Sequence, residues 1–307
     1  MEIHSRNNIL VSAPTGATKT LTAFLSILNE LIGSSEKNIL ESRVYAVYIS
    51  PLKALSNDVS VNLIEPLKEM EKIAKKKLGI KVAVRTGDTT PYERQKMLKK
   101  PPHILITTPE SLALMLTSFK FRELLRNVEW FIADEVHALA ENKRGVHLSL
   151  SIERLQVLSP HITRIGLSAT ISPLEEIAKF LVGNNKDGTE RDCKIINVQF
   201  IKDMDLKVLS PVPDLVDMEH KDMHESMYRL IDDLIQQHRT TLIFTNTRAA
   251  TERVIHHLKE KFPKRYTENI GAHHGSLSKT LRHNIENRLR KGELKTIVSS
   301  TSLELGI

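Results

Sequence analysis

The chain alternates between short apolar runs and longer stretches with helical periodicity. The apolar runs are rich in valine and isoleucine, which is typical of strands buried on both faces of a parallel sheet. The runs that predict strands are Ile9–Ser12, Val44–Ser50, Ile80–Arg85, Ile104–Thr107, Trp130–Ala133 and Arg164–Ser168. The stretches that predict helices between them are Leu55–Leu78, Tyr92–Lys99, Ser111–Leu116 and Val146–Leu158. We therefore expect an α/β doubly wound domain.

A polar segment with two glycines, 183–191, interrupts this alternation, and a Pro-Val-Pro turn follows at 211–213. We interpret Gly183–Asp217 as the passage between two domains. Beyond it, three helix-then-strand pairs predict a second, shorter α/β unit. They are Met223–Gln237 with Thr241–Thr245, Ala249–Phe262 with Ile270–His273, and Ser278–Arg290 with Thr296–Ser299. The predicted domains are residues 1–197 and 198–307.

The first apolar run leads into a phosphate-binding loop. The loop consists of Ser12, Ala13, Pro14, Thr15, Gly16, Ala17, Thr18, Lys19 and Thr20, and a helical pattern follows it. In such a loop, backbone N–H groups and a helix N-terminus hold a polyphosphate. We expect Lys19 to bind the β- and γ-phosphates of ATP and the Thr20 hydroxyl to bind Mg²⁺. The standard pattern has glycine at the positions of Ala13 and Thr18.

Two carboxylates follow the apolar strand Trp130–Ala133, at the sheet edge where open α/β sheets bind ligands. Mg²⁺ takes oxygen ligands, commonly one or two carboxylates together with phosphates, so Asp134 is the candidate metal ligand. Glu135 is the candidate for orienting or deprotonating the attacking water. Asp-Glu alone would more often be a solvated acidic turn. The Lys-Thr loop upstream favours the catalytic interpretation.

The order of these signals resembles the superfamily 2 DEAD/DEAH-box-like helicases, and the Lhr (large helicase-related) group in particular. That family's loop reads Ala-x-x-Gly-x-Gly-Lys-Thr, so that Ala13 matches and Thr18 departs from it. Asp134 to His137 match the carboxylate motif, and Ser168-Ala169-Thr170 match the third motif. The Lhr likeness extends to 50–55, 85–88, 137–139, 143–147 and 302–307. The resemblance implies two RecA-like domains, the second of them incomplete, with ATP and Mg²⁺ as cofactors.

The resemblance also implies strand-end loops that bind nucleic acid and residues that couple the two domains. The implied nucleic-acid residues of the first domain are Pro51, Leu52, Lys53, Arg85, Thr86, Gly87, Asp88, Thr108, Pro109 and Glu110. Those of the second are Thr245, Asn246, Thr247, Arg248, His274, Gly275, Ser276, Thr301 and Ser302. The implied coupling residues are His137, Ser168, Ala169, Thr170, Glu304 and Gly306. Hydroxyls and N–H groups in such loops bind phosphates without reading bases.

Composition agrees with a nucleic-acid partner but does not demand one. The chain has 44 lysines and arginines against 37 acidic residues, a net charge of +7. The single cysteine, Cys193, excludes a disulfide framework and a multi-cysteine zinc site. A reducing, cytoplasmic setting fits. No apolar run approaches the roughly 18 residues of a membrane span. Lys75-Lys76-Lys77 we interpret as cations at a helix C-terminus.

Three functions remain open at this point. The first is an ATP-dependent helicase or translocase core, with 3′-to-5′ movement on single-stranded DNA implied by the resemblance, which also suggests DNA repair. The second is a fragment that binds nucleic acid and ATP but hydrolyses little, because the next motif with its arginines lies beyond Ile307 and Thr18 crowds the loop. We expect Thr18→Gly to raise ATP affinity. The third is another nucleotide-binding enzyme, such as a kinase, which the strand-end motifs disfavour. DNA or RNA and the oligomeric state stay undecided.

Overall fold

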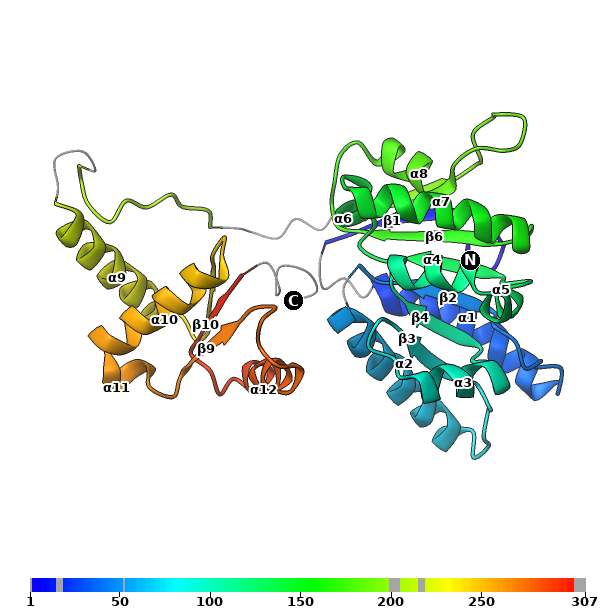
Figure 1. The fold of residues 1–307 in the computed structure, drawn as a ribbon, viewed down its shortest axis with the longest axis horizontal. Coiled ribbons are helices and arrows are strands. Elements are labelled where there is room, and N and C mark those ends of the chain that lie inside the picture. Colours follow the sequence, from blue (N-terminus) through cyan, green and yellow to red (C-terminus); the bar gives the residue numbers. More distant parts are fainter. Residues whose placement is uncertain (1, 15–18, 52, 199–204, 215–218, 301–307) are drawn as a thin grey trace. The chain divides into compact units, whose positions relative to one another are not determined.

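The chain divides into two compact units, Met1–Ile201 and Lys202–Ile307, shown as a ribbon in Figure 1. The structure is a computed structural model. It describes residues 2–14, 19–51, 53–198, 205–214 and 219–300, without the side chains of 53–62, 220, 279, 283 and 290. Over these residues no helix is long and apolar enough to cross a membrane.

The first unit is built on a seven-stranded sheet in the order β3-β4-β2-β5-β6-β1-β7, with every pairing parallel. The strands are β1 (Ile9–Ser12), β2 (Ala46–Ile49), β3 (Val82–Arg85), β4 (Ile104–Thr107), β5 (Trp130–Ala133), β6 (Thr163–Ser168) and β7 (Lys194–Asn197). The first six lie where the apolar runs predict them.

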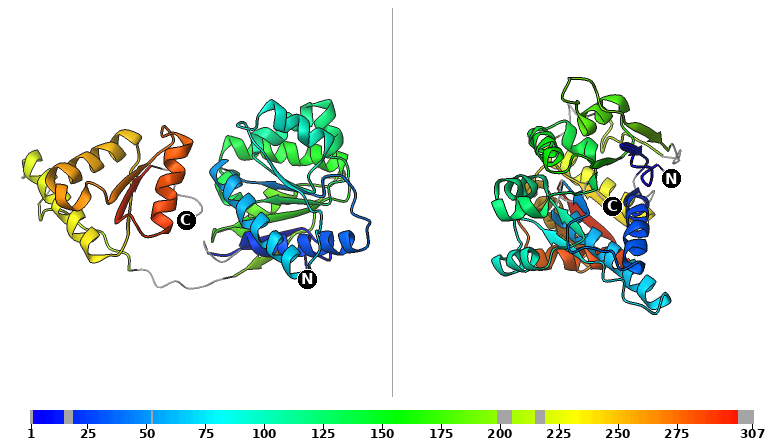
Figure 2. Two further views of the ribbon diagram at one scale, coloured as in Figure 1. Left: turned by 90° about the horizontal axis from the view of Figure 1, so that it is seen from below. Right: turned by 90° about the vertical axis from the view of Figure 1, so that its right-hand side faces the viewer.

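Eight helices connect these strands. They are α1 (Lys19–Glu36), α2 (Lys53–Ile73), α3 (Pro91–Lys99), α4 (Pro109–Thr117), α5 (Phe119–Leu124), α6 (Val136–Ala140), α7 (Lys143–Leu158) and α8 (Leu174–Val182). The pleat sends alternate residues to opposite faces. Ala46 and Tyr48 meet the core under α1 and α2, whereas Val47 and Ile49 meet the core under α4, α6, α7 and α8. The left view of Figure 2 shows helices on both sides of the strands. This two-layer covering explains the continuous apolar strands.

The interpretation of 183–217 as a passage between domains is wrong for its first part. Asn184 and Glu190 form an antiparallel bridge, and β7 then pairs with β1 at the edge of the first sheet. The β7 strand is four residues long and exposed throughout, so that its sequence carries little of the apolar signal of a buried strand.

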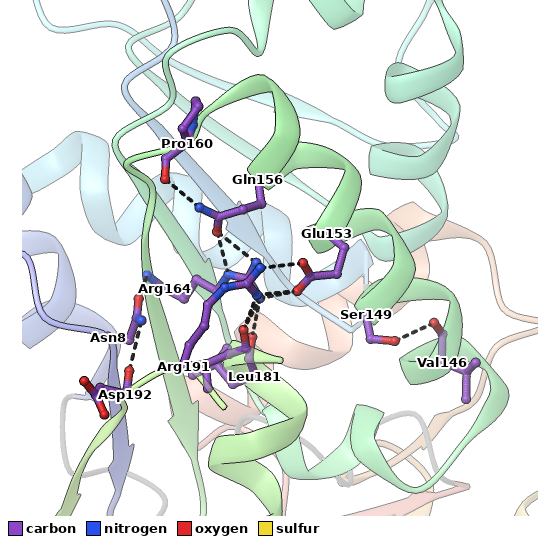
Figure 3. Close-up of polar contacts among 11 residues, drawn as sticks. Asn8, Val146, Ser149, Glu153, Gln156, Pro160, Arg164, Leu181, Arg191 and Asp192 are labelled. Carbon is purple, nitrogen blue, oxygen red and sulfur yellow. Dashed lines mark hydrogen bonds and ion pairs between the residues drawn. The ribbon is translucent and has the colours of Figure 1, made fainter. Parts of the chain in front are cut away.

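Buried polar contacts fasten this segment to the first unit, as Figure 3 shows. Arg164 on β6 is 1% exposed, and its guanidinium donates to Glu153 at 2.8 Å and to the carbonyl oxygen of Val182 at 2.7 Å. Arg191 donates to the same Glu153 carboxylate at 2.7 and 2.8 Å. Gly183 lies so close that an added Cβ would stand 2.6 Å from a Glu153 oxygen. One carboxylate on α7 therefore anchors both β6 and the segment after α8.

The second unit contains a parallel sheet in the order β8-β10-β9 among the described residues. Its elements are α9 (His220–Gln237), β8 (Thr241–Phe244), α10 (Arg248–Lys261), α11 (Pro263–Tyr266), β9 (Ile270–His273), α12 (Lys279–Arg290) and β10 (Thr296–Ser299). Tyr228, Leu258 and Tyr266 belong to the core on one face, and Ile285 and Leu294 to the core on the other. The α/β class predicted for both units is confirmed.

Candidate nucleotide and nucleic-acid site

The phosphate loop joins β1 to α1 at the carboxyl edge of the first sheet. Residues 15–18, Thr18 among them, lie outside the described residues. The Lys19 side chain begins α1, is nearly buried, and donates from Nζ to the carbonyl oxygens of Ala13 at 2.6 Å and Pro14 at 3.2 Å. The N–H of Ala13 donates to the carbonyl of Ser168 at 3.1 Å, which fixes the start of the loop against the end of β6.

Asp134 meets this loop because β5 and β1 both pair with β6. The Thr20 hydroxyl donates to Oδ2 of Asp134 at 3.2 Å, and the Glu135 N–H donates to Oδ1 at 2.9 Å. The hydroxyl of Tyr48 also donates to Oδ2. Burial raises the pKa of Asp134, while the hydrogen bonds from Tyr48, Glu135 and Thr20 lower it and offset part of that rise.

The Thr20 hydroxyl oxygen and the Asp134 carboxylate oxygen Oδ2 fit the chemistry of Mg²⁺. A hydroxyl and a carboxylate are the hard oxygen ligands that Mg²⁺ binds, at about 2.0–2.1 Å in octahedral geometry. Neighbouring ligands of such an octahedron stand about 2.9 Å apart, close to the 3.2 Å between Thr20 Oγ1 and Asp134 Oδ2. Across the described residues, no group of three or more His, Cys, Asp or Glu side chains is arranged to hold a metal.

A left-handed residue turns the chain sharply after Asp134. Glu135 has φ 47° and ψ 43°, a conformation that costs an ordinary residue about 1–2 kcal/mol. The turn starts α6 and brings His137 beside the end of β6, where its Nδ1 lies 3.2 Å from both the Ser168 Oγ and the Ala169 N–H. The Nε2 of His137 lies 3.5 Å from the Glu135 carboxylate.

The titration of this group of side chains follows from burial. Burial first, and then the charge of Asp134, raises the pKa of Glu135. Burial first, and then the charge of Lys19, lowers the pKa of His137. A neutral imidazole can accept the Ala169 N–H at Nδ1. The carboxylate motif and the Ser-Ala-Thr motif are thus in direct contact within the first unit.

The strand-end loops predicted to bind nucleic acid follow β2, β3 and β4, which are neighbours in the sheet. Thr108 caps α4 by accepting the Ser111 N–H, and Pro109 occupies the first turn. Thr86 accepts the Asp88 N–H at 3.3 Å, which shapes the loop with Gly87. Pro51 is buried, Leu52 lies outside the described residues, and the side chain of Lys53 is not described.

Arg85, which the resemblance places among the nucleic-acid residues, is buried. Its side chain is 6% exposed and donates to the Thr86 carbonyl at 2.7 Å, and burial lowers its pKa, with the charge of Arg94 adding to that effect. The guanidinium carbon lies 5.5 Å from the centre of the Phe121 ring. We infer that Arg85 supports the backbone of its loop.

Glu110 is also tied to a protein partner. Arg144 donates to its two carboxylate oxygens at 2.5 and 3.3 Å and to the carbonyl of Pro51 at 2.7 Å. Burial raises the pKa of Glu110, but the hydrogen bonds from Arg144, the Glu110 backbone and Thr108, together with the charge of Arg144, lower it by more, so that the net shift is downward. Arg144 therefore joins the loops after β2 and β4. Because a carboxylate repels phosphate, we infer that Glu110 contributes to this loop by holding Arg144 and not by binding the strand itself.

The predicted residues of the second unit also gather at strand ends. Arg248 at the start of α10 donates to Ser276 at 2.5 Å, and an added Cβ on Gly275 would lie 3.6 Å from the same guanidinium. Thr247 caps α10, with Thr245 and Asn246 before it. His274 is 6% exposed, with Nε2 2.7 Å from Glu252 and no partner at Nδ1. Thr301, Ser302, Glu304 and Gly306 lie outside the described residues.

Comparison with known proteins matches both units to helicase families. Residues 1–179 match the DEAD/DEAH box helicase family, and residues 224–307 match the helicase conserved C-terminal domain. The chain belongs to the DEAD/DEAH box helicase family. The resemblance to the Lhr group is confirmed by the similarities that follow.

Two of the curated relatives are helicases of the Lhr group. The chain is 57% identical to the ATP-dependent helicase Lhr-Core protein 2 of Thermococcus barophilus and 56% identical to the ATP-dependent helicase Lhr-Core of Methanothermobacter thermautotrophicus, over its whole length. It spans 36% of the length of each of these two relatives.

Among solved structures, the chain is similar to the Mycobacterium smegmatis helicase Lhr, determined with single-stranded DNA and AMP-PNP. The TM-score is 0.86 and the identity 42%, covering 99% of this chain and 39% of that one. The DEAD-box helicase Mss116, bound to single-stranded RNA, has the same fold, with a TM-score of 0.73 at 20% identity. The RecA-like architecture of this helicase family is thereby confirmed for both units.

Sequence reasoning missed two residues that the structure places at the site, Tyr48 and Arg144. Tyr48 lies opposite Ile132 in the β2–β5 register, and Asp134 follows two residues later on the same face. An apolar strand with a tyrosine gives no sign of this contact until the neighbouring strand is known. Arg144 is part of a segment shared with the Lhr group. The available signal was the residue type, because an arginine can donate two hydrogen bonds to one carboxylate.

Proposed function

We propose that this chain is the ATP-dependent motor core of an Lhr-type helicase, which couples ATP hydrolysis to movement along a nucleic-acid strand. The observation that carries the proposal is the meeting of Thr20 with Asp134 at 3.2 Å. These residues are 114 positions apart in the sequence, and the sheet order brings them together beside Lys19. Membership of the DEAD/DEAH box helicase family supports the same interpretation.

Each side chain has a stated task in this proposal. The Lys19 ammonium exchanges its carbonyl partners for the β- and γ-phosphates of ATP. Thr20 and Asp134 would hold Mg²⁺, which would neutralise phosphate charge. The Glu135 carboxylate orients the attacking water, and burial, which raises its pKa, makes it a better proton acceptor than an exposed glutamate.

His137 links the phosphate site to the end of β6 through direct side-chain contacts. It contacts Glu135 on one side and Ser168 with Ala169 on the other. A shift of Glu135 on hydrolysis therefore reaches the Ser168-Ala169-Thr170 segment through one imidazole. Coupling between nucleotide state and strand grip requires such an element with two arrangements.

The strand-end loops after β2, β3 and β4 bind phosphates of the translocating strand in this proposal. Backbone groups of the loops that contain Thr86, Gly87 and Thr108 would contact the strand without base specificity, while the buried Thr86 and Thr108 hydroxyls hold these loops in shape. Single-stranded DNA is the proposed substrate, because the Lhr of M. smegmatis was solved with it. Movement from 3′ to 5′ is proposed from the family resemblance.

The test is ATP turnover by the purified chain with and without single-stranded DNA. We expect the strand to stimulate turnover in the wild type. Asp134→Asn should abolish it and keep the fold, as judged by an unchanged circular dichroism spectrum. Strand binding without hydrolysis, with or without the Thr18→Gly change, would instead identify a hydrolysis-impaired binding fragment. Duplexes with 3′ or 5′ tails then test polarity, and RNA strands test the choice of DNA.

A further inference from the structure

The positive charge of the chain is concentrated in one segment, residues 72–100. This segment contains ten lysines and arginines and two acidic residues, a net charge of +8, whereas the whole chain carries +7. The other residues together are therefore close to neutral. Eight of the ten basic residues are exposed lysines, namely Lys72, Lys75, Lys76, Lys77, Lys81, Lys96, Lys99 and Lys100. We name these eight residues the amino-edge lysine cluster.

The topology gathers the cluster at one corner of the first unit. In a parallel sheet the helices run back, so that helix ends and strand starts share the edge opposite the carboxyl ends. The α2 helix ends at Ile73 and leads into β3, and α3 ends at Lys99 and leads into β4. The Lys81 carbonyl accepts the N–H groups of His103 at 2.8 Å and Ile104 at 3.1 Å, which joins the two lysine-bearing turns. Figure 1 allows these elements to be followed.

Helix dipoles do not account for the cluster. Cations stabilise a helix C-terminus only within its last turn, and the last turns of α2 and α3 contain Lys72, Lys96 and Lys99. Lys81 precedes β3, and Lys100 follows α3. None of the eight side chains forms an ion pair among the described residues. The nearby Glu71 carboxylate accepts the Leu78 N–H at 2.8 Å, within its own turn.

The cluster lies at the edge of the sheet opposite the predicted strand-binding loops, and strand β3 connects the two edges. Lys81 precedes β3 and Arg85 ends it, so the two lie about 13 Å apart along one strand. Within the described part of the chain β3 is an edge strand, with a sheet neighbour on one side, β4. Arg94 on α3, which donates to the Thr89 carbonyl at 2.9 Å, lies between the two ends.

We propose that the amino-edge lysine cluster binds the phosphate backbone of nucleic acid outside the strand held by the carboxyl-edge loops. The occupant is either a duplex arm or the flank of the loaded strand. Lysine ammoniums are point charges that attract phosphates without reading sequence. The choice of nucleic acid as the polyanion rests on the function proposed above.

The test compares two triple variants with equal changes in charge. K75Q/K76Q/K77Q removes part of the cluster, and K179Q/K186Q/K194Q removes three exposed lysines near β7 at the opposite edge of the sheet. Binding of a fluorescent ten-nucleotide single strand, a forked duplex, a blunt duplex and a 40-nucleotide strand is measured from 50 to 300 mM salt.

We expect the cluster variant to bind the forked duplex or the 40-nucleotide strand at least tenfold more weakly at low salt. Its log–log salt slope should be smaller by about two to three, since each lost phosphate contact accounts for about 0.9 in duplex DNA. The control variant should keep the wild-type slope. A loss confined to the forked and blunt duplexes identifies a duplex arm, and a loss confined to the long strand identifies the flank.

Equal losses in both triple variants would overturn the proposal, because they would report net charge alone. Unchanged binding of all longer substrates by the cluster variant would overturn it as well. Weakened binding to vesicles of anionic lipid, with DNA binding intact, would point to a membrane surface instead and also reject it. If the wild type fails to bind even the ten-nucleotide strand, the proposed function itself is wrong.

Discussion

The hydroxyl of Tyr48 on β2 donates to the Oδ2 atom of Asp134 at the end of β5, and Tyr48 is fully buried. The same oxygen accepts the Thr20 hydroxyl. The tyrosine ring packs against Phe24 of α1, with ring centres 5.2 Å apart. Tyr48 thus fixes the carboxylate relative to α1, the helix that follows the phosphate loop.

Tyr48→Phe should keep the ring packing and remove one donor to a buried carboxylate. Such a loss costs about 1–3 kcal/mol. We expect roughly tenfold more Mg²⁺ to be needed for half-saturating binding of a fluorescent AMP-PNP analogue. Tyr45→Phe is the matched control, because the Tyr45 hydroxyl accepts the Glu41 N–H away from the site. The same Mg²⁺ requirement in both variants would show that Tyr48 does not position Asp134.

Gly145 in α7 permits a close approach to α6, so Gly145→Ala should be strongly destabilising. An added Cβ would stand 1.9 Å from the Leu139 carbonyl oxygen. We expect a loss of at least about 3 kcal/mol in unfolding free energy, measured by urea denaturation. Gly33→Ala in α1 is the control, since nothing lies within 4 Å of its added Cβ. That change should stabilise by about 0.5–1 kcal/mol. A similar effect at both positions would contradict the structure.

Glu153 serves two guanidiniums, so Glu153→Ala should cost more stability than an exposed ion pair. It leaves the buried Arg164 without its carboxylate and releases Arg191 from α7. We expect a loss of about 2–4 kcal/mol in unfolding free energy. Glu190→Ala, which removes a partner of the exposed Lys179, should leave the urea midpoint unchanged. Proteolysis between residues 183 and 193 should quicken only in the Glu153 variant.

His103 should lower the free energy of unfolding as the pH falls below about 6.5. Burial first, and then the charge of Lys81, lowers the pKa of His103 to about 4. The unfolded chain, with a histidine pKa near 6.5, binds the proton more readily between these values. Stability is therefore full above about pH 6.5 and declines towards pH 4, by about 2 kcal/mol at pH 5. Urea unfolding at pH 7.5 and pH 5 measures it. His103→Asn should reduce the difference, and an identical difference would refute the assignment.

Most of the fold could be predicted from the sequence because it follows from local patterns. Most strands of the first unit are marked by apolar runs such as Trp130–Ala133, because both faces of these strands are buried. The edge strand β7 could not be predicted so, because exposure removes the need for an apolar run. Tyr48 and Arg144 were missed for a different reason. Their partners, Asp134 and Glu110, are 86 and 34 residues away, and only the strand order brings them together.

The order of the strands in the first sheet also bears on how such proteins can diversify. The strands β3, β4 and β2, whose loops we propose to hold nucleic acid, form one end of the sheet, and β5, β6 and β1 with the nucleotide residues lie beyond them. An insertion after β3 or β4 would lengthen the outer margin without moving any residue that contacts Lys19 or Asp134. New substrate preferences can therefore evolve at this end of the sheet while the residues around Lys19 and Asp134 stay unchanged.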